Sequence, residues 1–262
     1  MEKYTLYRID DWVLLAFAAA ALVFCSLHAA RRAFRQPVPT DLLGSGAASH
    51  DGQIERHGLF QRIYHWSNAA AVLMLSFSGL MIYQPRQMPA VEEATSAWFS
   101  LHLWGVALLL AGIVAHMIYE SFIAAGANPM ALNRGEARRI WGTVKNFLGL
   151  SGDYPRSGKY HGGQILFHWG VAANLFLLIL TGIVLWKPLR DLLPLSPFGL
   201  GWDFIFFSRV LHGLFSAALI ACLVIHFYFA LFIQKNWPEA KSMITGRISE
   251  KDDPASHSAG PE

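Results

Sequence analysis

The chain has 262 residues, of which 54% are hydrophobic and 15% are charged. This composition, with a mean hydropathy of +0.34, excludes an ordinary soluble domain and predicts several membrane spans. The two cysteines, Cys25 and Cys222, both fall in apolar runs, so the sequence has no CxxCH motif and no cysteine cluster for zinc or iron–sulfur ligation. It also has no glycine-rich phosphate loop and no basic stripe for nucleic acid, and we expect no nucleic-acid partner.

Five apolar runs follow one another along the chain and predict five membrane-spanning helices in an all-α protein. They cover residues 12–30, 61–83, 98–121, 164–186 and 206–233. Few positive charges precede the first run, whereas Arg31, Arg32 and Arg35 follow it directly. This asymmetry favours an uncleaved N-terminal anchor over residues 1–35 with its N-terminus outside.

The segments between the spans differ in composition. Residues 36–58 contain prolines and a Gly/Ser/Ala stretch, and they predict a flexible linker in which His50 and His57 are solvated. Residues 122–163 predict a long loop that carries six Lys and Arg residues. The tail is polar, and residues 251–262 predict disorder.

Lys and Arg residues are distributed unequally between the two sides of the predicted membrane. With the N-terminus outside, fifteen of them fall inside and six fall outside. Positive residues favour the cytoplasmic side, so the count predicts five spans with the C-terminus inside. The basic residues in the tail are also suited to contact with anionic lipid.

The last span carries two histidines, His212 and His226, fourteen residues apart. In a helix this spacing places both imidazoles on one face and ~21 Å apart along the axis. Ionisable residues within a span indicate a functional site by default. The pair is what one helix needs to bind two stacked haems of b type, although interhelical hydrogen bonds are an alternative.

Depth in the predicted topology sorts the remaining histidines. His102 lies at the outer end of the third span, at the depth of His212. Three candidates share the inner depth of His226, namely His65, His116 and His168, and depth alone leaves that choice open. Arg62, one turn before His65, is suited either to a haem propionate or to marking topology.

Four motifs, in order, resemble one family. They are RIYHW followed by SFSGL, LHLWG, GKYHGGQ leading into LTGIVLWKP, and the helix of His212 and His226. From about residue 58 to 250 they resemble the di-haem cytochrome b (gamma) subunit of membrane-bound formate dehydrogenase and the related nickel–iron hydrogenase cytochrome b. The resemblance implies a four-helix di-haem domain over residues 59–250, to which the first span is an addition.

Two haem b groups and their ligands are implied by the same resemblance. The inner haem iron takes His65 and His226, with His116 as a possible alternative to His65, and the outer haem iron takes His102 and His212. Arg62 is expected to contact a haem.

A quinone site is implied beside the inner haem, in the segment before the fourth span. The residues carried over are Tyr160, His161, Gly163 and Gln164, with His226. His161 stands where asparagine is common in the family, which leaves the choice of menaquinone or ubiquinone open. A glycine-rich turn before a helix is the structural alternative.

The function implied is that of a respiratory complex in the bacterial cytoplasmic (inner) membrane. Electrons would enter from an iron–sulfur subunit on the outer face and reach a quinone near the cytoplasm. Substrate chemistry would belong to a catalytic subunit with molybdenum or tungsten, or with nickel and iron. Alternatives are a hydrogenase or thiosulfate reductase complex, including flow from quinol to reductase, and a stand-alone cytochrome b561-type oxidoreductase. A histidine-based metal transporter is disfavoured because the spans lack acidic residues apart from Glu120 at a span end.

Overall fold

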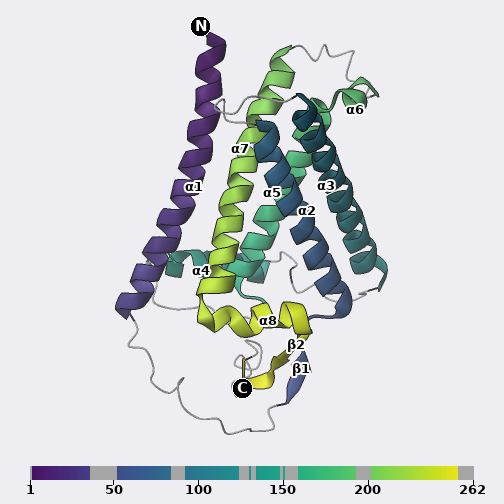
Figure 1. The fold of residues 1–262 in the computed structure, drawn as a ribbon. Helices are drawn as coiled ribbons and strands as arrows, with labels where there is room; N and C mark the ends of the chain where they lie inside the picture. The colour runs from purple at the N-terminus through teal and green to yellow at the C-terminus, as the bar shows by residue number, and fades with distance from the viewer. Residues whose placement is uncertain are drawn as a thin grey trace. The chain divides into compact units, whose positions relative to one another are not determined.

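The computed structural model describes residues 2–35, 52–83, 92–123, 130, 134–147, 150, 159–192 and 202–252. The helices in these ranges are α1 (Glu2–Arg35), α2 (Leu59–Tyr83), α3 (Glu92–Ile118), α4 (Arg134–Phe147), α5 (Gly162–Leu185), α6 (Lys187–Leu192), α7 (Trp202–Phe227) and α8 (Trp237–Thr245) (Figure 1). Two π-helical turns, η2 (Tyr119–Ile123) and η4 (Tyr228–Phe232), follow α3 and α7. Two short strands, β1 (Gln53–Glu55) and β2 (Arg247–Ser249), and the 3-10 turns η5 (Gln234–Asn236) and η6 (Glu250–Asp252) complete the described elements.

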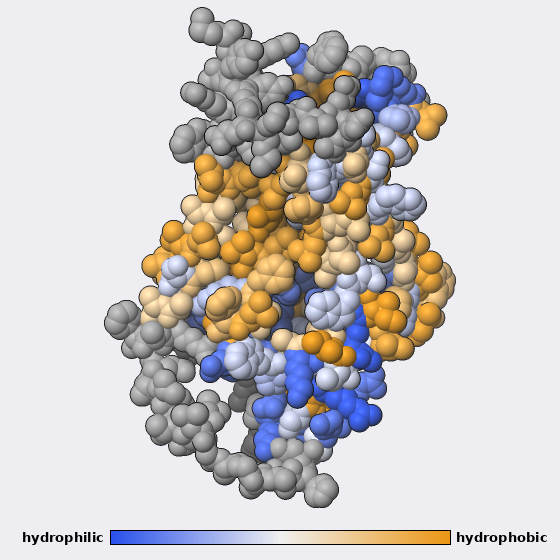
Figure 2. Space-filling model, viewed as in Figure 1, coloured by the Kyte–Doolittle hydropathy of each residue, from blue (hydrophilic) through white to orange (hydrophobic). Residues whose placement is uncertain are grey.

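Five of these helical segments are long and apolar enough to cross a membrane. They are Val13–Arg31, Leu59–Tyr83, Ser96–Ile123, Gly162–Leu185 and Asp203–Phe232, which confirms the five spans predicted from the sequence. Figure 2 shows hydrophobic side chains over the visible sides of the long helices and hydrophilic ones gathered over α8 and the two strands. Exposed apolar helices of this length are stable in lipid, where their backbone groups are satisfied internally.

The first of two compact units comprises residues 1–49, 140–154 and 161–236. In it α7 packs against both α1 and α5. The Nδ1 atom of His28 on α1 lies 2.9 Å from the hydroxyl of Tyr228, and Phe24 lies 6.4 Å, centroid to centroid, from Phe229. The additional N-terminal helix is therefore packed on the helix that carries His212 and His226.

The second unit comprises residues 50–139, 155–160 and 237–262. Its central feature is the packing of α2 against α3. The two helices approach closely at Gly105, where an added Cβ would lie 2.9 Å from Cγ of Leu75. Small residues permit such close approach of helices in membranes.

The two strands join distant parts of the second unit. β1 pairs antiparallel with β2, and Ile54 lies opposite Ile248. Gly246, with φ +82°, precedes β2, and its carbonyl accepts the backbone N–H groups of both Arg56 and His57. The expectation that the linker is flexible up to residue 58 is therefore wrong for residues 53–58, whereas residues 36–51 lie outside the described part of the chain.

Two further expectations need correction. The segment 122–163 is not simply a loop, because α4 forms within it and α5 already begins at Gly162. The predicted tail 251–262 begins within η6, and residues 253–262 lie outside the described residues.

Candidate functional site

In the second unit a serine on α2 holds His102 of α3. The hydroxyl of Ser78 lies 3.0 Å from Nδ1 of His102 and donates its proton to the carbonyl of Met74, at 2.7 Å. Gly79 follows, and a Cβ there would lie 3.6 Å from Cε1 of His102. Ser78 is fully buried, so the imidazole lies against a hydroxyl that solvent does not reach.

In the first unit a threonine on α5 holds His212 of α7 in the same way. The hydroxyl of Thr181 lies 2.8 Å from Nδ1 of His212 and donates to the carbonyl of Leu177, also at 2.8 Å. Gly182 follows, and a Cβ there would lie 3.6 Å from Cε1 of His212.

These two helix pairs are an internal repeat. On α2 the dipeptide His65-Trp66 precedes Ser78 by thirteen residues counted from the histidine, and on α5 His168-Trp169 precedes Thr181 by the same number. On α3 and α7 the histidines stand fourteen residues apart, at 102 and 116 and at 212 and 226.

The second histidines of the two pairs, His116 and His226, also have similar surroundings. Tyr64 stacks on His116 with ring centroids 4.3 Å apart, and Phe167 stacks on His226 at 5.6 Å. Each aromatic residue directly precedes the histidine of its HW dipeptide. The helices that carry the histidine pairs, α3 and α7, pass into the π-helical turns η2 and η4. His116 and His168 are therefore the internal counterparts of His226 and His65.

The hydrogen bonds of His102 and His212 fit iron ligation. A hydroxyl has one proton, and in both cases a backbone carbonyl accepts it, so the hydroxyl oxygen accepts a hydrogen bond from Nδ1–H. The protonated Nδ1 leaves the lone pair on Nε2, the form in which a neutral imidazole binds a metal. Among the described residues no group of three or more His, Cys, Asp or Glu side chains is arranged for a metal ion.

A buried polar cluster lies at the start of α2 in the second unit. The side chain of Arg56 donates to Oε1 of Glu239 at 2.9 Å and to the backbone carbonyl of Lys159, and the residue is only 4% exposed. Its guanidinium lies 5.5 Å from the ring centroid of Tyr160. Arg56 thus ties the residues before α5 to α8 and β1.

His57 belongs to this cluster, and the expectation that it is solvated is wrong. It is 4% exposed, its ring stacks on Tyr160 with centroids 6.5 Å apart, and its Nδ1 is buried without a hydrogen-bond partner among the described residues. Burial, with the positive charges of Arg56 and Lys159, lowers the pKa of His57 to about 4. Burial also raises the pKa of Tyr160, so at neutral pH the imidazole is neutral and the phenol keeps its proton.

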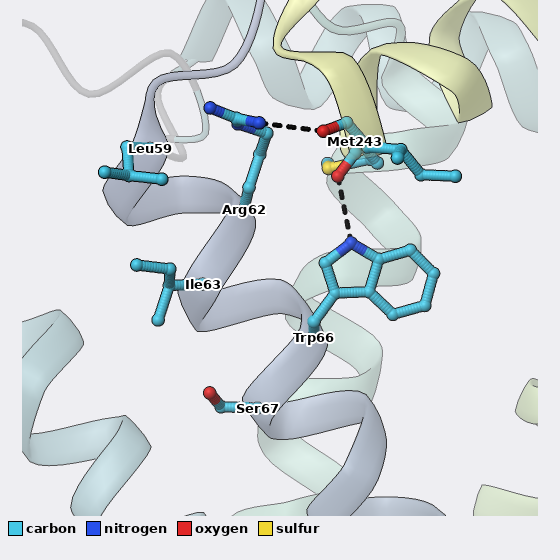
Figure 3. A pocket seen from close by; sticks show the side chains of 7 residues that line it. Leu59, Arg62, Ile63, Trp66, Ser67 and Met243 are labelled. Atoms are coloured by element: carbon cyan, nitrogen blue, oxygen red, sulfur yellow. Dashed lines mark hydrogen bonds between the residues drawn. The ribbon is translucent and has the colours of Figure 1, made fainter.

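Arg62, expected at a haem, reaches the end of α8. Its Nη1 donates to the carbonyl of Ile244 at 2.7 Å, and Nε1 of Trp66 donates to the carbonyl of Met243 at 2.9 Å (Figure 3). The two side chains line an open groove of about 620 Å³. The other lining residues are Leu59, Ile63, Ser67, Met243 and Ile244.

His161 and Gln164, expected at a quinone, form a reciprocal cap at the start of α5. The Nδ1 atom of His161 accepts from the backbone N–H of Gly163 and Gln164, at 3.1 and 3.3 Å, while Oε1 of Gln164 accepts from the backbone N–H of His161 at 3.0 Å. This is a capping box in which histidine takes the usual place of serine or threonine. An asparagine can cap a helix in the same way.

Three residues of the site, Ser78, Thr181 and His57, were not predicted from the sequence. Ser78 and Thr181 were detectable from their equal distance to the two HW dipeptides. His57 carried no such signal, because its burial depends on the pairing of β1 with β2, nearly two hundred residues further on.

Comparison with known proteins gives the chain its relatives. The family model described as prokaryotic cytochrome b561 matches residues 56–246. The nitrate-inducible formate dehydrogenase cytochrome b556(Fdn) subunit of Escherichia coli (strain K12) is 20% identical over 204 residues, covering 78% of this chain and 88% of that protein. The formate dehydrogenase cytochrome b556(fdo) subunit of the same strain is 24% identical over 187 residues, covering 69% and 80%. No solved structure matches significantly.

Proposed function

Because the chain belongs to the prokaryotic cytochrome b561 family, we propose that it carries electrons between an iron–sulfur subunit on the outer face of the membrane and a quinone near the cytoplasm. The family is one of b-type cytochromes, so the chain binds haem b, and it is a multi-pass protein of the bacterial inner membrane. Its named relatives are formate dehydrogenase subunits, which favours a formate dehydrogenase-type complex.

We assign two haems to four histidines. His102 and His212 would hold the outer iron, with their Nδ1 atoms beside the hydroxyls of Ser78 and Thr181. His65 and His226 would hold the inner iron, and Arg62 lies one turn from His65 at the same helix end. When bound, the haems supply the one-electron steps that carry charge across the membrane. The matching environments of His102 and His212 are the observation that carries this proposal.

The quinone is assigned to the start of α5 and the residues before it. Tyr160 keeps its proton at neutral pH and is suited to donate a hydrogen bond to a quinone carbonyl. Gly163 leaves room for the ring of His161, because a Cβ there would lie 2.9 Å from its Cε1, and His161 and Gln164 hold the helix end in place through their capping box. His226 completes the set. Menaquinone and ubiquinone both present the two carbonyl oxygens that such donors bind.

Haem content tests the ligand assignment directly. In detergent-purified full-length chain we expect two haem b per chain by pyridine haemochrome. His102→Ala and His65→Ala should each retain one haem, whereas the control His116→Ala should retain two. Absence of haem from a folded wild-type chain would overturn the proposal. Loss of a haem from His116→Ala, but not from His65→Ala, would move the inner ligand to His116.

Partner capture separates the proposed complex from a stand-alone oxidoreductase. A tagged chain expressed with its native subunits should copurify with an iron–sulfur protein and a molybdenum or tungsten enzyme. A chain that purifies alone, with both haems reducible by a soluble donor, would instead support the stand-alone alternative.

A further inference from the structure

We propose that Ser78 and Thr181 are positioning residues that fix the ligating form of His102 and His212 and thereby lower the potential of the outer haem. This inference rests on the proposed function, because it concerns residues that would act on a haem only through its histidine ligands. It assigns a role to two hydroxyls that neither ligate iron nor touch a quinone.

The direction of the two hydrogen bonds carries the argument. Ser78 has one hydroxyl proton, and two carbonyls of its own helix compete for it, those of Met74 at 2.7 Å and Leu75 at 3.3 Å. The proton of Thr181 has the equivalent acceptors, Leu177 at 2.8 Å and Leu178 at 3.1 Å. A hydroxyl that gives its proton to one of these carbonyls accepts at the imidazole, and Nδ1 then carries the hydrogen.

A role in helix packing alone does not explain why the hydroxyls of Ser78 and Thr181 both lie at Nδ1 of a histidine. A hydroxyl bonded to the carbonyl four residues earlier is a common way to satisfy Ser or Thr within a helix, and it requires no histidine. Here the same hydroxyl also meets Nδ1 in both units, thirteen residues after an HW dipeptide and directly before a glycine that leaves room at Cε1. The same arrangement occurs in both compact units, so it is a repeated geometry within this chain.

The expected consequence is electronic. A hydrogen bond accepted from Nδ1–H makes the imidazole a stronger donor to its metal and fixes the ring orientation. A stronger donor favours ferric over ferrous iron and lowers the reduction potential. Two such bonds on the ligands of one haem would make that haem a better reductant toward the next acceptor.

Potentiometric titration of the two b-haem absorbance bands tests the proposal. We expect Ser78→Ala and Thr181→Val each to keep two haems and to raise the potential of one haem, the same haem in both variants. The double variant should raise it further. The electron paramagnetic resonance signal of that haem should also shift, because the axial rings are no longer held. Neither readout depends on catalytic turnover.

Two controls separate this effect from general perturbation. Ser76→Ala removes a buried hydroxyl from the same helix that has no hydrogen-bond partner among the described residues, and Thr181→Ser keeps the hydroxyl. Both should retain wild-type potentials. Wild-type potentials and spectra in Ser78→Ala and Thr181→Val would overturn the inference while leaving the haem assignment intact. If Ser78→Ala does not fold, the contrast between Thr181→Val and Thr181→Ser decides the question alone.

Discussion

At the scale of single residues, His57 shows how the fold selects one form of a titratable side chain. Its ring stacks on Tyr160, and its backbone N–H donates to the carbonyl of Gly246 just before β2. The positive charges of Arg56 and Lys159 also act on it. Uncharged imidazole is the only form this environment tolerates near neutral pH. Its position next to Tyr160 also places it beside the residues assigned to the quinone.

The stability of the protein should therefore decrease as the pH falls through a window set by the pKa of His57. Its pKa is about 4 in the folded chain and near its ordinary value of 6.5 when unfolded, so between these values the unfolded state binds more protons. Stability then decreases as the pH falls from 6.5 toward 4, by up to about 1.4 kcal/mol per pH unit from this group. Thermal unfolding in detergent between pH 4.5 and 8 measures it.

His57→Gln provides the comparison. The wild-type midpoint temperature should fall more steeply than that of the variant below pH 6.5, and the two curves should run parallel between pH 7 and 8. Parallel curves over the whole range would show that His57 is accessible to protons in the folded state and contradict its burial.

At the scale of elements, the start of α5 depends on its cap. His161→Asn should preserve the cap, because asparagine is among the best N-cap residues, whereas His161→Ala should cost about 1 kcal/mol. Chemical or thermal unfolding of the two variants in one detergent distinguishes them. Equal destabilisation by Asn and Ala would indicate that the imidazole does not act as the cap.

The close contact of α2 with α3 at Gly105 leads to a second prediction about stability. Gly105→Ala would place a Cβ 2.9 Å from Cγ of Leu75, a branch point that cannot swing away freely, and we expect a loss of about 1–3 kcal/mol. Gly170→Ala on α5 is the matched control, since outside the adjoining residues and the local helix backbone no heavy atom lies within 4 Å of the added Cβ, and it should be neutral or slightly stabilising. Adding Leu75→Ala to Gly105→Ala should recover part of the loss. An equal effect of the two glycine substitutions in unfolding experiments would contradict the close approach.

At the scale of the whole molecule, the sequence predicted what depends on local composition and missed what depends on distant partners. Each span is encoded by its own run of about 20 apolar residues, and the structure confirms all five. The burial of His57 was missed because β1 finds its partner only at Arg247–Ser249. α4 was missed because its charged sequence lacks the apolar run on which the other helices were recognised. The role of His161 as a cap was not foreseen, because a histidine before two glycines gives no standard capping signal.

Membrane orientation is the remaining property of the whole chain that the sequence predicts. Five spans, the number found among the described residues, predict termini on opposite sides, and the fifteen-to-six division of Lys and Arg predicts a C-terminus inside. Green fluorescent protein fused after residue 262 should therefore fluoresce, and alkaline phosphatase fused there should be inactive. Phosphatase fused to a chain truncated after residue 90, between the second and third spans, should be active. Because Arg31, Arg32 and Arg35 act on the first span, replacing them with Gln should weaken its orientation first and leave the later spans, which have their own charges, in place. The reverse pattern in the unmodified fusions would invert the topology and put the proposed quinone residues on the outer side.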